Sequence, residues 1–144
     1  MHTVIWKKSL ANGTVVQITE KGGAAGWEAN DGNSLLYLKP DSSGIWEKSI
    51  PDGDEALLIK ADPSFVTVTS NSVFYIHPPQ SAAQQIIMRY DLERQQSEEV
   101  ATIPIKPVHY FSRWGFAVSP DEQWIYFSQV DKSESDLMLT EGIL

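Results

Sequence analysis

Cysteine is absent from the 144 residues of this chain, and its absence removes several kinds of chemistry. Disulfide frameworks, thiolate nucleophiles and zinc sites built on cysteine are excluded. Basic residues are also few, since Lys and Arg number 11 against 19 Asp and Glu, for a formal net charge of −8. Phosphate contacts require a surplus of Lys and Arg, so we predict no direct nucleic-acid binding and no docking on anionic membranes.

Long apolar runs and helical periodicity are missing as well. No stretch approaches the roughly 18 apolar residues that span a bilayer, and residues 1–10 hold no apolar core of signal-peptide type. The compartment is therefore left open between cytoplasm and periplasm. The best helical candidate, Asp91–Val100, has apolar residues only near its ends, and we interpret it as a charged hairpin turn followed by a strand.

An internal repeat is the most informative feature that is present. Residues 5–13 (IWKKSLANG) align with residues 45–53 (IWEKSIPDG) at an offset of 40, with five of nine positions identical. Further similarities join residues 33–38 to residues 71–76 at an offset of 38, and Asp31-Gly32…Leu36-Tyr37 to Asp121-Glu122…Tyr126-Phe127 at an offset of 90. Repeats of about 40 residues indicate an array of similar structural units.

Each unit is rich in β-forming residues and divided by turn signals. Asn12-Gly13, Asp31-Gly32 and Asp52-Gly53 are pairs that supply the positive φ angles of tight hairpins. We expect outer strands of one unit in residues 1–22, four-stranded antiparallel units in residues 23–61 and 62–106, and inner strands of a last unit in residues 107–144, with its final strand near 137–140. A β-sandwich is the alternative, but sandwich strands are not copies of one another. The prediction is an all-β chain of about three propeller blades.

One segment carries a family resemblance. Residues 116–129 (FAVSPDEQWIYFSQ) resemble the Ser-Pro-Asp-Gly motif of TolB-type, WD-repeat-like β-propellers, in which a first strand ends in this motif and a second strand follows at once. Glu122 stands in the usual Gly position. Pro120 fixes φ and Asp121 can accept hydrogen bonds from amides two residues on, so the motif predicts a locked turn.

The resemblance implies a ring of six blades, and the chain supplies about half of that. A sheet left open exposes edge strands and apolar faces. Two expectations follow: the chain is the C-terminal portion of a larger propeller, or two chains close one six-bladed ring as a homodimer in which the last unit takes a strand from the partner's N-terminus.

Catalytic and metal-binding constellations are not apparent in the sequence. The three histidines, His2, His77 and His109, have no ligand-like spacing and are interpreted as unrelated loop or strand-end residues. No Gly-x-Ser-x-Gly elbow occurs, and the carboxylates are interpreted as solvated turns. We therefore predict no catalytic residue, no metal and no cofactor.

Aromatic residues provide the candidate binding site. Trp6 and Trp46 occupy equivalent repeat positions, so we expect both in the core between blades. Loops leading into innermost strands line one face of a propeller, and Trp, Tyr and Arg are enriched in binding hot spots. The predicted ligand-binding residues are Trp27, His109, Tyr110, Arg113 and Trp114, although aromatic packing between blades is an alternative role for them.

Three functions compete at this point. The leading prediction is a non-catalytic scaffold that recognises a protein or peptide partner. The second is the C-terminal sensor or regulatory module of a bacterial signalling or transcriptional protein. The third is the propeller part of a hydrolase, which would require buried carboxylates with raised pKa facing the axial channel.

Overall fold

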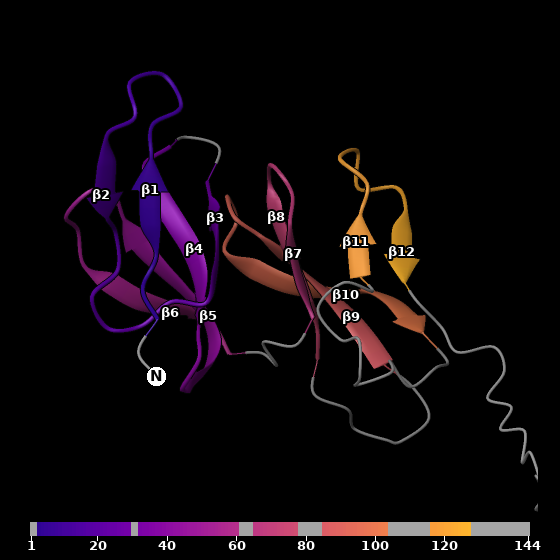
Figure 1. Cartoon of the computed structure of the whole chain (residues 1–144). Helices are drawn as coiled ribbons and strands as arrows, with labels where there is room; N and C mark the ends of the chain where they lie inside the picture. The colour runs from indigo at the N-terminus through magenta and orange to yellow at the C-terminus, as the bar shows by residue number, and fades with distance from the viewer. Residues whose placement is uncertain (1–2, 30–31, 61–64, 78–84, 104–115, 128–144) are drawn as a thin grey trace, which may run out of the picture.

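A computed structural model describes residues 3–29, 32–60, 65–77, 85–103 and 116–127 (Figure 1). Twelve β-strands and no helix occur in these ranges. The strands form two two-stranded and two four-stranded sheets, all antiparallel. The predicted all-β class and the four-stranded antiparallel units are therefore confirmed.

The sheets follow one another along the chain. Sheet I holds β1 (Trp6–Lys8) and β2 (Val15–Gln17). Sheet II holds β3 (Ala25–Glu28), β4 (Ser34–Lys39), β5 (Ser42–Ser49) and β6 (Glu55–Ile59). Sheet III holds β7 (Val66–Val68), β8 (Ser72–Ile76), β9 (Gln85–Asp91) and β10 (Gln96–Ile103). Sheet IV holds β11 (Phe116–Val118) and β12 (Ile125–Phe127).

Local hydrogen bonds explain the turns between these strands. The Asn12 side chain accepts a hydrogen bond from the Thr14 amide at 3.0 Å, and Gly13 takes a φ of 78°. In the β9–β10 turn, the Asp91 carboxylate accepts hydrogen bonds from the amides of Glu93 and Arg94. The interpretation of Asp91–Val100 as a charged turn followed by a strand is confirmed, because β10 begins at Gln96.

The core consists of apolar layers between successive sheets. In β4, Leu36 and Leu38 join a cluster with residues of sheet III, whereas Leu35 and Tyr37 face the opposite way and pack with residues that flank the strands of sheet I. In β8, the odd-numbered side chains meet sheet II and the even-numbered ones meet sheet IV. Both four-stranded sheets are thus covered on both faces at their second strand.

The two repeat-related tryptophans have different surroundings. Trp46 is half-buried against the cluster between sheets I and II. Trp6, at the equivalent position of β1, is 57% exposed, so the expectation that both lie in the core is wrong for Trp6. The reason is that Trp6 faces away from sheet II, and none of the described residues packs a further sheet on that side.

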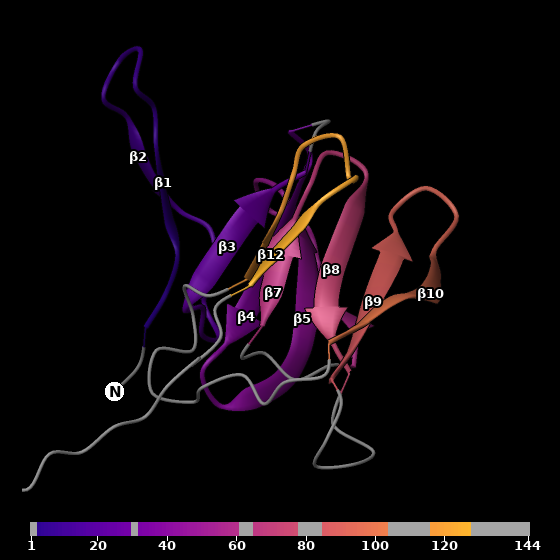
Figure 2. The same ribbon diagram turned by 90° about the vertical axis from the view of Figure 1, so that its right-hand side faces the viewer.

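The first strands of the last three sheets lie near one another. β3, β7 and β11 each form an edge of their sheet, and β11 contacts β7. The turned view shows the β11–β12 hairpin over β7 and β8 (Figure 2). The β7–β8 and β11–β12 turns lie at the same end of the stack (Figure 1). This arrangement positions the site described next.

Candidate functional site

A groove of about 390 Å³ runs across the first strands of three sheets. We call it the first-strand groove, and it is lined by Trp27, Glu28, Val68, Thr69, Ser70, Val118 and Pro120. Its surface combines one indole, one carboxylate, two hydroxyl groups and small apolar side chains. Such a mixture of apolar walls and a few polar groups is typical of binding sites.

Trp27 has two roles in this groove. Its position in β3, opposite Leu36, turns the side chain toward the apolar layer between sheets II and III, where it packs at the edge of the cluster. The indole is only half-buried, and its remaining surface lines the groove. Both sequence-based interpretations of Trp27, core packing and ligand contact, are therefore compatible with its position.

A second cleft of about 490 Å³ adjoins the groove through Ser70, which lines both. This cleft lies between the ends of sheets II and III and includes the β7–β8 and β9–β10 turns. Its charged lining residues are Glu47, Arg89, Asp91 and Glu93. Acidic groups thus outnumber basic ones there, which favours ligands with positive or neutral groups.

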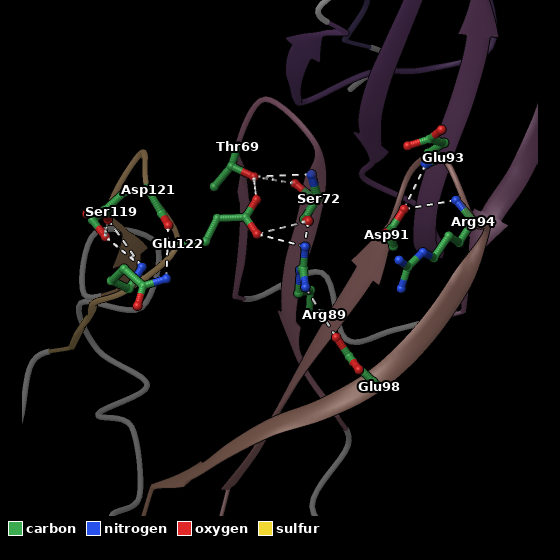
Figure 3. Close-up of polar contacts among 11 residues, drawn as sticks. Thr69, Ser72, Arg89, Asp91, Glu93, Arg94, Glu98, Ser119, Asp121 and Glu122 are labelled. Atoms are coloured by element: carbon green, nitrogen blue, oxygen red, sulfur yellow. Dashed lines mark hydrogen bonds and ion pairs between the residues drawn. The ribbon is translucent and has the colours of Figure 1, made fainter.

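A polar cluster fixes one wall of the groove (Figure 3). We call it the Glu122 cluster, and it consists of Thr69, Ser72, Arg89 and Glu122. Thr69 donates a hydrogen bond of 2.5 Å to one oxygen of the Glu122 carboxylate. The other oxygen accepts a hydrogen bond from Ser72 at 3.3 Å and lies 3.0 Å from an Arg89 nitrogen.

The Glu122 cluster connects elements that are distant in sequence. Glu122 belongs to the β11–β12 turn, whereas Thr69 and Ser72 flank the β7–β8 turn. Arg89 on β9 also donates to the Ser72 hydroxyl at 2.9 Å and lies 3.3 Å from Glu98 of β10. Because charge-assisted hydrogen bonds are the stronger ones, the cluster holds the turn of sheet IV against sheet III and keeps Thr69 in the groove wall.

The predicted turn lock of the Ser-Pro-Asp segment is confirmed. The Asp121 carboxylate accepts hydrogen bonds from the Ser119 hydroxyl and, at 3.2 Å, from the Gln123 amide. These hydrogen bonds hold the pKa of the Asp121 carboxyl below its usual value, with the Ser119 bond as the main cause. The turn also places Glu122 at a φ of 58°, a left-handed conformation that explains why glycine suits this position.

Of the predicted binding residues, only Trp27 is in the described part of the chain, and it lines the groove. His109, Tyr110, Arg113 and Trp114 lie outside the described residues. Sequence reasoning did not identify the remaining groove residues or the Glu122 cluster. The departure from glycine at Glu122 was a usable signal, because a residue other than glycine at a position that favours positive φ requires specific contacts to hold it there.

Metal-binding clusters and membrane-spanning helices are absent from the described residues. Within the described ranges, no group of three His, Asp or Glu side chains could hold a metal ion. No helix in those ranges is long and apolar enough to span a bilayer. Comparisons with protein-family models, curated proteins and solved structures find no match for this chain.

Proposed function

We propose that the chain is a non-catalytic binding module of β-propeller type that recognises a peptide segment of a partner protein. The first-strand groove is the proposed contact surface. The observation that carries this proposal is the convergence of a half-buried indole, two hydroxyl groups and a carboxylate in one groove shared by three sheets.

The propeller organisation is supported by how the sheets stack. Successive sheets pack face to face, and both faces of β4 and β8 are buried. In a propeller the first strand of every blade lies nearest the axis, which matches the proximity of β3, β7 and β11. The proposed groove would then open on the axial region of one face of the ring.

The groove chemistry suits a peptide. The half-buried indole of Trp27 offers a flat apolar surface with little conformational entropy to lose. Ser70 is exposed at the junction with the second cleft and can donate or accept a hydrogen bond. The acidic lining of that second cleft, with Glu47, Asp91 and Glu93, favours a segment that carries Lys or Arg.

The hydrolase alternative receives no support from the titrating groups. A general acid requires a carboxyl group with a raised pKa. Among the described residues, the carboxyl groups of Glu55, Asp91 and Asp121 are those with a clear departure, and hydrogen bonds lower the pKa of each. Lowered values are typical of carboxylates that cap turns or form ion pairs.

The test is peptide selection followed by groove mutagenesis. A random peptide library displayed on phage is selected on the immobilised full chain, and the affinity of an enriched peptide is measured by calorimetry. We expect Ser70→Arg, which fills the junction of the two clefts, to weaken binding at least about tenfold, or about 1.4 kcal/mol. Leu10→Arg makes the same charge change at a side chain that is 99% exposed and should leave the affinity unchanged.

A second groove variant keeps the test informative if Ser70→Arg does not fold. Trp27→Ala removes the indole, and circular dichroism shows whether the strands remain. Equal affinity of the wild type, Ser70→Arg and Trp27→Ala for every enriched peptide would refute the groove as the contact surface.

A further inference from the structure

We propose that a second copy of the chain completes the two terminal sheets by strand exchange. In this arrangement β1 of one copy pairs antiparallel with β12 of the other, which gives a four-stranded sheet of order β11–β12–β1–β2. The proposal rests on the propeller organisation proposed above and adds the partner, the strand edges and the residue register.

The two-stranded sheets are complementary halves of a complete sheet. The β1–β2 register repeats that of β5–β6 at an offset of 40, since Trp6 pairs with Gln17 as Trp46 pairs with Leu57. Sheet I therefore corresponds to the third and fourth strands of sheet II.

Sheet IV corresponds to the other half. The β11–β12 register repeats that of β3–β4 at an offset of 90, since Val118 pairs with Ile125 as Glu28 pairs with Leu35. Sheet IV thus matches the first and second strands, and in the described part of the chain β12 pairs only with β11, and β1 only with β2.

The complete sheet II gives the register of the missing contact. In sheet II, β4 pairs with β5 through Leu35↔Lys48, Leu36↔Glu47 and Tyr37↔Trp46. Applying the two offsets predicts the intermolecular pairs Ile125↔Lys8, Tyr126↔Lys7 and Phe127↔Trp6. The aromatic pair Tyr37↔Trp46 would thus be repeated by Phe127 and Trp6 across the two copies.

Exposed aromatic side chains lie at the edges of both β1 and β12. On β1, Trp6 is 57% exposed. Trp124 is 66% exposed and Tyr126 is 61% exposed, whereas Leu36, the counterpart of Tyr126 in sheet II, is fully buried. Phe127 is 45% exposed, whereas its counterpart Tyr37 is fully buried. Large apolar groups gathered at an unpaired strand are a feature of association surfaces.

The lysines of β1 are compatible with a central position in a sheet. Lysine often protects an edge strand from pairing, but here Lys7 lies 2.6 Å from Glu28 of sheet II. Lys8 corresponds to Lys48, which belongs to the central strand β5 and donates to the Gly53 carbonyl at 2.8 Å. A lysine at this repeat position therefore does not prevent pairing on both sides.

A second copy satisfies both edges at once. Sheets I and IV lie on opposite sides of sheets II and III (Figure 1), so the two halves within one chain do not meet. With two copies, the contact from β12 to β1 occurs twice around a two-fold axis, and the closed assembly has no unpaired edge at these positions. Twelve described strands per copy then form six four-stranded sheets.

The test is site-specific cross-linking, which the absence of cysteine makes clean. Lys7→Cys and Tyr126→Cys are prepared as separate full-length variants, mixed under unfolding conditions, refolded together and oxidised. We expect a covalent species of twice the chain mass from the mixture and none from either variant alone. Mixing Lys7→Cys with Trp124→Cys, which is two residues out of register, is the matched control and should cross-link poorly, because disulfides require Cβ atoms about 4 Å apart.

Light scattering of the wild type gives an independent measurement. A mass of two chains at tens of micromolar is expected, and a single-chain mass would overturn the proposal. Absence of the predicted cross-link, or equal cross-linking of the control, would also overturn it. The cross-link is expected to be absent if the strand predicted near residues 137–140, outside the described residues, pairs with β12 in place of β1. Trp27 belongs to β3 and not to the exchanged sheet, so full peptide affinity of Trp27→Ala together with the expected cross-link would refute only the groove.

Discussion

At the scale of single residues, Glu122 shows a balance between backbone strain and side-chain contacts. Its left-handed conformation disfavours any side chain by roughly 1–2 kcal/mol. Its carboxylate holds Thr69, Ser72 and Arg89, and hydrogen bonds to charged groups each contribute about 1.5–3 kcal/mol. The free energy that these contacts contribute is therefore larger than the cost of the backbone strain.

Two substitutions of Glu122 separate the contribution of its side-chain contacts from the cost of its backbone strain. We predict that Glu122→Ala lowers the free energy of unfolding by about 2–3 kcal/mol, because the contacts are lost and the strain remains. Glu122→Gly should cost about 1 kcal/mol less than the alanine variant, because glycine adopts the same φ freely. Urea unfolding followed by circular dichroism measures both. A glycine variant more stable than the wild type would show that strain dominates.

Glu55 predicts a dependence of stability on pH. Its carboxylate lies 2.9 Å from the Lys39 ammonium and accepts a 2.5 Å hydrogen bond from the Tyr37 hydroxyl. These two contacts, Lys39 first, hold the pKa of Glu55 below its usual 4.5. Because the folded-state pKa is the lower one, the stabilisation is complete above the unfolded-state pKa and is lost as pH falls through the folded-state pKa.

The matching variant is Glu55→Gln. We expect it to lower the free energy of unfolding by about 1–3 kcal/mol near neutral pH and by clearly less at a pH below the folded-state pKa. Denaturant titrations at the two pH values measure the difference. A loss of stability that is the same at both would contradict the assigned role of the ionised carboxylate.

At the scale of elements, β4 is buried on both faces. Leu35, which faces sheet I, is 7% exposed to solvent, and Leu36, which faces sheet III, is 0% exposed. In a sheet with one solvated face, only one of two neighbouring residues would be in the core.

We therefore predict that Leu35→Ala and Leu36→Ala each lower the free energy of unfolding by about 2–5 kcal/mol. Leu10→Ala is the control, because a surface substitution usually changes stability by less than about 0.5 kcal/mol. Thermal or denaturant unfolding measures all three. A negligible effect of Leu35→Ala would mean that sheet I does not cover sheet II in solution.

The sequence predicted elements better than it predicted their surroundings. Turn chemistry at Asn12-Gly13 and the apolar strand segments are local signals, so the hairpins were predictable. Burial is not local: Trp6 and Trp46 share one repeat position, yet within the described ranges a sheet packs over Trp46 and none packs over Trp6. Thr69 and Glu122 are 53 residues apart, and no pattern in the sequence connects them. The groove was therefore predicted only through Trp27.

At the scale of the whole molecule, charge predicts which partners are rejected. The net charge of −8 repels a polyanion, and few Lys or Arg are available to replace its counterions. We expect no change in the fluorescence anisotropy of a labelled DNA duplex when the chain is added at physiological salt. A saturable change that weakens with added salt would contradict this prediction and would favour a nucleic-acid function.

The order of the strands has a consequence for how the chain reaches its native state. Every hydrogen-bonded strand pair among the described residues joins strands that are consecutive in the sequence. Contacts between close neighbours require little loop closure, and proteins rich in them fold faster than β-proteins with distant pairings. Each sheet can therefore form as soon as its own residues leave the ribosome, before the following sheet is synthesised. If two copies exchange strands as proposed above, the slow step is their association, whose rate depends on concentration.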